Sequence, residues 1–206
     1  MEQVDHKKEL SKFYNQPKNS ISIVDVPAMN FLMIDGTGSP NENSGYSEAV
    51  GSLYAVAYHL KFAVKKNALQ IDYKVMPLEG LWWAEDMREF RLDNRDNWLW
   101  RMMIMQPDFI TADMARESIK GVREKKNPPR LDKVRFESFK EGLSGQIFHS
   151  GSYGEAERPT IERLHHYLFD HGYNLSGKHH EIYLNSPLKT VPAKLRTIIR
   201  QPAEAI

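Results

Sequence analysis

The sequence IMQP at residues 104–107 returns as IRQP at residues 199–202, 95 positions later. Two further pairs of segments match in the same order along the chain: IDYKVMP at 71–77 with EIYLNSP at 181–187, and FLMIDGTG at 31–38 with QIFHSGSY at 146–153. Matches that keep their order along a chain indicate a structural unit that is used twice. The sequence therefore predicts two copies of one module, at about residues 21–107 and 131–202.

Hydrophobic patterns predict the same succession of elements in both copies. The first copy has an apolar run at 31–35 that ends in Gly-Thr-Gly, a helical apolar stripe over 46–64, and strands at 71–76 and 98–105. The second copy has a strand at 145–149, a helix that begins near Pro159, and strands at 179–184 and 195–200. Two strand–helix–strand–strand modules predict an α+β fold, with a mainly antiparallel sheet, helices on one face and a central ligand cleft on the other.

The rest of the chain is assigned around these copies. Residues 1–20 are expected to be an N-terminal extension, and residues 21–206 a single domain. A helix over 110–126, which stops before an Asn-Pro-Pro breaker, is expected to link the two copies. Residues 131–139 are expected to add a strand that pairs with 21–26.

Composition excludes several classes of protein. The 206 residues are 41% apolar and 27% charged, which is typical of a globular domain. The absence of cysteine excludes disulfides, thiol catalysis and cysteine-bound metals. A formal net charge of +1 argues against a direct nucleic-acid partner. Because no segment resembles a signal peptide or a membrane span, we expect a cytoplasmic protein without a membrane partner.

The strands that follow the helix in each copy, at 71–76 and 179–184, carry the first candidate site residues. Side chains alternate along a strand, so Glu181 and Tyr183 share one face. The repeat alignment places Tyr73 at the position of Tyr183, so both tyrosines are expected to line the cleft. Residues 78–83 are expected to be an insertion directly after the first of these strands. At least one of its two tryptophans, Trp82 and Trp83, is expected to form a wall of the pocket.

Further aromatic residues enlarge this set: Tyr54, Tyr58, Trp98, Trp100 and Tyr153. An aromatic box with a carboxylate at its base suits flat apolar ligands, including cationic ones. Burial would also raise the pKa of such a carboxyl group towards the range useful for acid–base catalysis. Ordinary structural roles stand beside this hypothesis: a solvated strand face for Glu181, a helix N-terminus for Glu157, a solvated loop for Glu79, and core packing for the aromatic residues.

Several other chemistries lack the residues that they need. His179, His180 and Glu181 are consecutive in a strand, so they point to opposite faces and do not form a metal site. The sequence Gly36-Thr37-Gly38 does not have the spacing of a nucleotide-binding loop, and no Gly-x-Ser-x-Gly motif is present. We therefore expect neither a metal nor a cofactor.

Three motifs, together with the duplication, carry a resemblance to a known family: PLEGLWW at 77–83, HSGSY at 149–153, and HEIYLNSP at 180–187 followed by TIIRQP at 197–202. Over about residues 20–202 the chain resembles the GyrI-like small-molecule-binding superfamily. This resemblance implies a pseudo-twofold module whose cleft binds aromatic, often cationic compounds. Glu181 matches the buried glutamate of the multidrug-sensing regulators in the superfamily. The DNA-binding helix-turn-helix of those regulators would not fit into residues 1–20.

Stand-alone members of the superfamily include hydrolases that open the cyclopropane of DNA-alkylating cyclopropanoid compounds. The resemblance implies that Glu181 and Glu157 activate a water molecule, and that Tyr73 or Tyr183 stabilises charge as the ring opens. The expected ligand-binding residues are Tyr183, Trp82, Trp83, Tyr153, Trp100 and Tyr54. The resulting hypothesis is a detoxifying hydrolase for flat aromatic xenobiotics, present as a monomer or a weak homodimer.

Two alternatives remain open at this stage. A non-catalytic module that binds or sequesters drugs would need the same aromatic box and the same carboxylate. An inhibitor that binds another protein, such as gyrase, is suggested only by the name of the superfamily.

Overall fold

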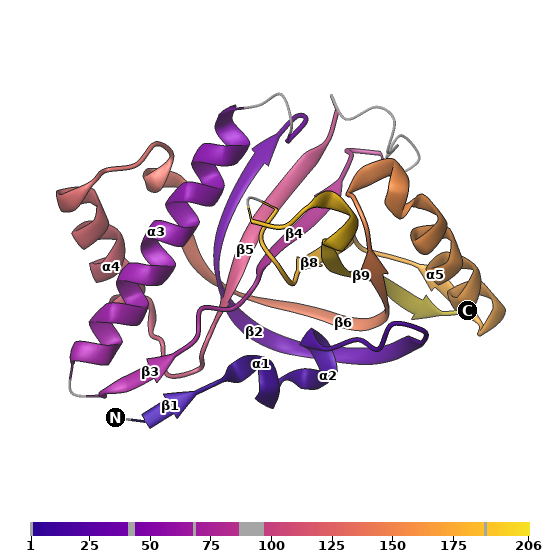
Figure 1. Cartoon of the computed structure of the whole chain (residues 1–206), viewed down its shortest axis with the longest axis horizontal. Helices are drawn as coiled ribbons and strands as arrows, with labels where there is room; N and C mark the ends of the chain where they lie inside the picture. The colour runs from indigo at the N-terminus through magenta and orange to yellow at the C-terminus, as the bar shows by residue number, and fades with distance from the viewer. Residues whose placement is uncertain (1, 41–43, 68, 87–96, 188) are drawn as a thin grey trace.

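The computed structural model describes residues 2–40, 44–67, 69–86, 97–187 and 189–206 (Figure 1). The elements in chain order are β1 (Glu2–Val4), α1 (His6–Glu9), α2 (Ser11–Tyr14), β2 (Ile21–Thr37), α3 (Ser44–Lys66), β3 (Ile71–Tyr73), β4 (Leu78–Trp83), β5 (Leu99–Gln106), α4 (Ala112–Lys125), η2 (Leu131–Lys133), β6 (Arg135–Ser150), η3 (Gly154–Glu157), α5 (Arg158–Asp170), β7 (Tyr173–Leu175), β8 (His179–Tyr183), η4 (Pro192–Lys194) and β9 (Arg196–Ala205), where η marks short 3₁₀ turns. None of the described helices is long and apolar enough to cross a membrane.

The main sheet closes on itself. Its strands follow the order β6-β2-β5-β4-β8-β9, and β6 also pairs with β9, so these strands form an antiparallel barrel. The short β7 extends β9, and β1 pairs in parallel with β3. This arrangement confirms the α+β class and the mainly antiparallel sheet.

The two halves of the barrel meet at β4 and β8, where Gly80 lies opposite Glu181. The structural counterpart of β8 is therefore β4, whereas the repeat alignment had matched residues 181–187 with 71–77. Residues 78–83, expected to be an insertion, are the central strand itself. Consequently the predicted equivalence of Tyr73 and Tyr183 is wrong, because Tyr73 ends the short β3 beside β1.

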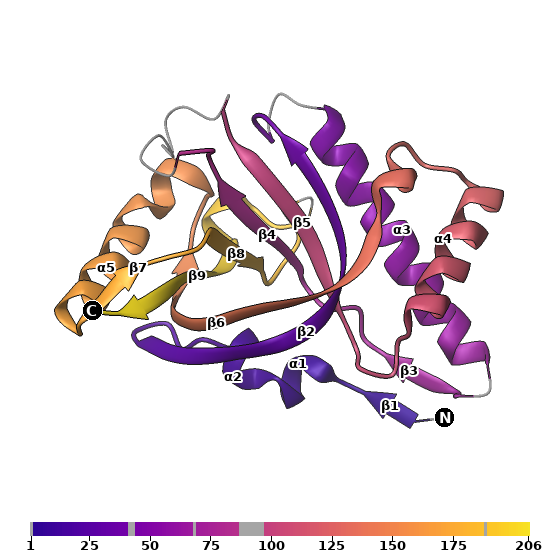
Figure 2. The same cartoon turned by 180° about the vertical axis from the view of Figure 1, so that it is seen from behind.

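Two long strands, β2 and β6, run side by side along the barrel (Figure 2). They contain 17 and 16 residues, and each joins two segments that the sequence had suggested separately. Residues 135–139 pair with 29–33, and residues 142–147 pair with 21–26. The predicted pairing of 131–139 with 21–26 is therefore wrong. Because β2 and β6 run antiparallel over almost their full length, the beginning of β6 pairs with the second half of β2, and the end of β6 pairs with residues 21–26.

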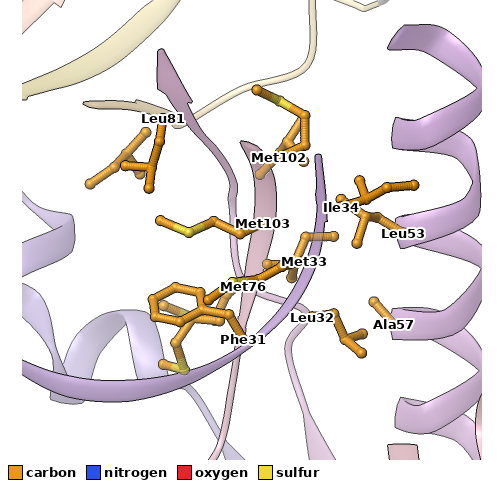
Figure 3. Packing of buried hydrophobic residues seen from close by; sticks show 14 of the residues in the cluster. Phe31, Leu32, Met33, Ile34, Leu53, Ala57, Met76, Leu81, Met102 and Met103 are labelled. Atoms are coloured by element: carbon orange, nitrogen blue, oxygen red, sulfur yellow. The ribbon is translucent and has the colours of Figure 1, made fainter. Parts of the chain in front are cut away.

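Helices cover the outer face of the barrel on two sides. Along β2, Leu32 and Ile34 point outward to Leu53 and Ala57 of α3, whereas Phe31 points to the opposite side (Figure 3). On the second half, the outer face packs against α5 through a separate cluster: Ile147, Ile161, Leu164, Leu168 and Ile199. This alternation follows from strand geometry, which sends successive side chains to opposite faces.

The space between α3 and α5, over β4 and β8, is where the cleft lies. The sequence predicts a cleft on the face opposite the helices. The cleft instead lies on the face that carries them, and residues of α3 line it. The physical reason is closure of the sheet, since its second face becomes the interior of the barrel and is filled by side chains.

The barrel interior holds a buried charged cluster. His180 lies between two carboxylates, with Nδ1 2.8 Å from Glu141 Oε1 and Nε2 3.0 Å from Glu79 Oε2. Arg200 Nη1 lies 2.8 Å from Glu141 Oε2. The side chains of all four residues are at most 2% exposed, so Glu79 is not the solvated loop residue that the sequence suggested.

The N-terminal segment closes one end of this barrel through α2. Tyr14 is buried, and its hydroxyl donates a hydrogen bond of 2.7 Å to Glu79 Oε1. Arg200 Nη2 donates to the carbonyl oxygen of Phe13 at 2.6 Å. Because buried charges need hydrogen-bonding partners, Phe13 and Tyr14 of the N-terminal segment complete the cluster in the barrel interior.

Candidate functional site

The floor of the cleft is the outer face of β4 and β8. Strand alternation turns Gly80 and Trp82 of β4, and Glu181 and Tyr183 of β8, towards the cleft. Above this floor lies a cavity of about 780 Å³. A volume of this size accommodates a small organic molecule.

Aromatic side chains from several elements form the walls: Tyr46, Tyr54 and Tyr58 of α3, Trp82 of β4, Trp98 before β5, Tyr153 before η3, and Tyr183 of β8. The three α3 tyrosines are separated by eight and then four residues, so they lie along one side of the helix. The Trp82 ring lies 5.3 Å from that of Trp98 and is stacked 6.0 Å from that of Tyr46. These walls offer large flat surfaces to a ligand.

Glu181 lies at the base of this cavity and is 6% exposed. Its Oε1 atom is 3.2 Å from Nε2 of His179, and its carboxylate also accepts a hydrogen bond from the Tyr183 hydroxyl. That hydroxyl in turn accepts a bond of 3.1 Å from Nε1 of Trp82. The carboxylate is therefore shielded from bulk water and held from two sides.

The tyrosines around Glu181 are strong candidates for hydrogen-bond donors. Burial, followed by the negative charge of Glu181, raises the pKa of the Tyr46, Tyr153 and Tyr183 hydroxyls above the ordinary value of 10.0. These hydroxyls therefore keep their protons at neutral pH. A ligand oxygen in the cavity would meet donors and not phenolates.

Glu157 brings a second buried carboxylate to the same cavity, at the start of α5. It is 1% exposed, and its Oε2 atom accepts a hydrogen bond of 2.6 Å from the backbone N–H of Gly154. The bond runs back into η3, and the side chain does not cap the N-terminus of α5. Two carboxylates and several rings in one cavity favour ligands with positive or developing positive charge.

The cavity brings together six of the residues proposed from the sequence: Glu181, Glu157, Tyr183, Trp82, Tyr153 and Tyr54. Sequence reasoning did not assign Tyr46 to the site. The signal was available, because Tyr46, Val50, Tyr54 and Tyr58 follow a strict four-residue spacing on the predicted helix.

Three other proposed residues lie away from the cavity lining. Tyr73 is buried in a separate cluster, where its ring meets that of Phe109 edge-on at 5.6 Å. Trp100 lies behind the wall, with its ring 5.4 Å from that of Tyr46. Trp83 faces the other side of β4, where Nζ of Lys178 is 3.4 Å from the centre of its ring. The roles proposed for these three residues in ligand contact therefore do not fit the geometry.

Gly80 lies next to Trp82 and Tyr183, two residues of the cavity lining. A Cβ atom at this position would lie 2.6 Å from Met102 Cε, 2.8 Å from Trp82 Nε1 and 3.0 Å from the Tyr183 hydroxyl oxygen. Gly80→Ala is therefore expected to break the Trp82–Tyr183 hydrogen bond and to weaken binding of the flat cation ethidium by about tenfold, as loss of about 1.4 kcal/mol requires. Quenching of tryptophan fluorescence measures this affinity.

Gly51→Ala provides the matched control for this prediction. Gly51 lines the cavity, but a Cβ atom there meets nothing within 4 Å. Its affinity for ethidium should stay within about twofold of that of the unmodified protein. Equal affinities of the two variants would show that the Trp82–Tyr183 contact does not shape the cavity.

Within the described residues, no group of three or more His, Asp or Glu side chains is arranged to hold a metal ion. The described side chains at the site offer two carboxylates, one imidazole and the surrounding hydroxyl and indole donors.

Solved structures from Listeria innocua resemble this protein along the whole chain. An uncharacterized conserved protein from that organism is 39% identical, with a TM-score of 0.90, and the match covers 98% of this chain and 100% of the other. Two further structures, each described as a hydrolase, are 38% and 36% identical, with TM-scores of 0.88 and 0.83 and the same coverage. A comparison with curated proteins found no match.

The model of one protein family, the GyrI-like small molecule binding domain, matches residues 19–203. This range includes every strand of the closed barrel, apart from the last two residues of β9, and both carboxylates of the cavity. The chain therefore belongs to the family of GyrI-like small-molecule-binding domains.

Proposed function

We propose that this protein is a hydrolase that takes flat aromatic electrophiles into the cavity and opens a cyclopropane ring with water, with detoxification as the result. The observation that carries the proposal is the position of Glu181, a buried carboxylate held by two hydrogen-bonding groups beneath aromatic walls. The two Listeria proteins described as hydrolases support an enzymatic role.

The proposed reaction begins with a water molecule held by Glu181, with Glu157 beside it. The water oxygen forms a bond to a cyclopropane carbon, and Glu181 accepts the proton that the water loses. The strained carbon–carbon bond breaks, and its electron pair moves into the conjugated carbonyl group, which becomes a phenolate. Proton return from Glu181 to that oxygen, directly or through solvent, completes the addition of one water molecule.

A hydrogen-bond donor near Glu181 makes a second contribution to the rate, because it stabilises the negative charge that develops on the substrate. The Tyr153 hydroxyl keeps its proton, so it can donate a hydrogen bond to the carbonyl oxygen as that oxygen gains negative charge. The aromatic walls hold the ring system of the substrate and exclude bulk water. A positioned general base contributes about 10²–10⁴-fold to such a rate, which is substantial for a substrate that is already strained.

Glu181→Gln tests the proposal. We expect this variant to lose turnover of an aromatic cyclopropanoid by about 10²-fold or more, because the amide cannot accept the proton from water. Affinity for the same compound, measured by fluorescence quenching, should change by less than about tenfold. Mass spectrometry detects the product as the substrate plus one water.

Glu155→Gln is the matched control, because Glu155 is an exposed carboxylate close to the site that pairs with Arg158. It should keep full turnover. Equal turnover in Glu181→Gln would remove this residue from the mechanism.

The second candidate function is a binding module that sequesters aromatic cations without chemistry. It is favoured by the presence of two buried carboxylates in one aromatic cavity, which suits a cation without any reaction. Binding of cyclopropanoids and of ethidium by the wild-type protein, with no gain of water by the cyclopropanoid, would identify this function in place of the hydrolase.

A further inference from the structure

We propose that His179 is a positioning residue that keeps the Glu181 carboxylate ionised and fixed in orientation. The inference deepens the proposed function, and it rests on that function only where turnover is measured.

The contact between the two side chains is direct and buried. His179 and Glu181 are separated by one residue in β8, so both side chains leave the strand on the same face. Nε2 of His179 lies 3.2 Å from Oε1 of Glu181, and the two side chains are only 4% and 7% exposed. Such a contact is stronger away from water than it would be on the surface.

Burial alone disfavours an ionised carboxylate, so Glu181 needs a group that offsets this cost. The groups that face it from other elements are Tyr46 of α3, Tyr153 and Glu157 around η3, and His149 of β6. Within its own strand it meets Tyr183 and His179. The tyrosines are neutral donors, and the like charge of Glu157 works against ionisation.

His149 carries a potential positive charge but directs its ring elsewhere. Its Nδ1 atom lies 2.9 Å from Thr160 Oγ1, and its Nε2 atom lies 3.2 Å from the carbonyl oxygen of Ser152. Of the groups that face Glu181 in the described part of the chain, His179 alone combines direct contact with the ability to become a cation.

The neighbouring residue His165 does not prevent His179 from interacting with Glu181 in this way. His165 of α5 is close enough for the charge of His179 to affect it. Burial, and then the charge of His179, lowers the pKa of His165 to about 4. His165 is therefore neutral at neutral pH and does not compete with His179 for positive charge.

The geometry has a consequence for catalysis. A general base must be ionised at the working pH and must point at the water that it activates. With an N–H at Nε2, His179 donates to Oε1 of Glu181 and so fixes the orientation of the carboxylate at the base of the cavity. Loss of His179 should then remove a donor that favours the ionised carboxylate and loosen the orientation of Glu181.

The test compares His179→Phe, which removes the N–H, with His179→Gln, which retains one. The Glu181 carboxyl carbon is followed by ¹³C NMR in the ligand-free protein across pH, with Glu181→Gln used for assignment. We expect His179→Phe to raise the Glu181 midpoint by about one pH unit or more, and His179→Gln to raise it less. His166→Gln, a change at an exposed neighbouring histidine, should leave the midpoint unchanged.

Turnover of an aromatic cyclopropanoid gives the second readout. In His179→Phe the acid limb of the rate profile should move to higher pH with the Glu181 midpoint, and kcat at neutral pH should fall about tenfold while KM stays within about twofold. His179→Gln should recover part of this loss. A defect that is merely structural would not move the acid limb.

An unchanged Glu181 midpoint in folded His179→Phe would overturn the inference, even if the wild-type protein is a hydrolase. A shifted midpoint in a protein that turns over no cyclopropanoid would support the inference and reject the hydrolase. If His179→Phe does not fold, ¹⁵N shifts of the His179 ring in the wild-type protein decide the matter. They must respond at the Glu181 midpoint if the contact is as proposed, and their failure to respond overturns it.

Discussion

Replacement of Arg200 by methionine is expected to lower the free energy of unfolding by about 3–5 kcal/mol. The Arg200 side chain is 1% exposed and lies inside the barrel. Its guanidinium contacts Glu141 Oε2 at 2.8 Å, Gln146 Oε1 at 3.1 Å and the Phe13 carbonyl oxygen at 2.6 Å. Methionine has a similar length but no donor, so it would leave Glu141 charged, buried and short of one partner.

Arg135→Met is the matched control. Arg135 also contacts a carboxylate, with Nη2 2.8 Å from Asp35 Oδ2, but that carboxylate is 45% exposed and also pairs with Arg101. Removal of a solvated ion pair costs at most about 1 kcal/mol. Urea unfolding measures both variants. A loss in Arg200→Met no larger than that in Arg135→Met would mean that the barrel cluster contributes little to stability.

The sequence predicts the individual elements better than their assembly. Apolar periodicity located α3, and the alternation along β8 correctly separated Glu181 and Tyr183 from His180, because both signals are local. Closure of the barrel depends on pairing between β6 and β9, which are distant in sequence. No local pattern encodes such a pairing, so the interior face and its charged cluster were not predicted.

The assignment of site residues failed where it depended on repeat alignment. Tyr73 was matched to Tyr183 because both precede a proline by four residues, yet the two lie in strands with different partners. Composition also cannot tell whether a tryptophan faces a cavity or the core. Trp98 and Trp100 differ by two residues in sequence, but only Trp98 reaches the cavity lining.

The strand β8 presents different chemistry on its two faces. Glu181 points to the cavity, where its charge is proposed to act on a ligand, whereas His180 points into the barrel between Glu79 and Glu141. Strand alternation places these two neighbouring residues on opposite faces, so a change in the charge of one has a different effect from a change in the charge of the other. Protonation of His180 should affect stability, and protonation of Glu181 should affect the activity of the site.

The stability of the protein is accordingly expected to fall as the pH rises from about 6.5 to about 9. Burial by itself lowers the pKa of His180, but the charges and hydrogen bonds of Glu141 and Glu79 outweigh it and raise the pKa from 6.5 to about 9. The folded protein therefore holds this proton more tightly than the unfolded chain. The stabilisation is complete below pH 6.5, declines by about 1.4 kcal/mol per pH unit above it, and is lost once the pH passes 9.

The acid side of the curve should slope the other way. Burial lowers the pKa of His165 to about 4, so the unfolded chain binds that proton more tightly and stability rises as the pH increases from 4 to 6.5. Urea unfolding at a series of pH values should thus show greatest stability near pH 6.5–7. In His180→Gln the decline above that maximum should disappear, whereas His166→Gln, at an exposed position, should retain it. A wild-type protein equally stable at pH 7 and pH 9 would show that His180 is not held protonated between its two carboxylates.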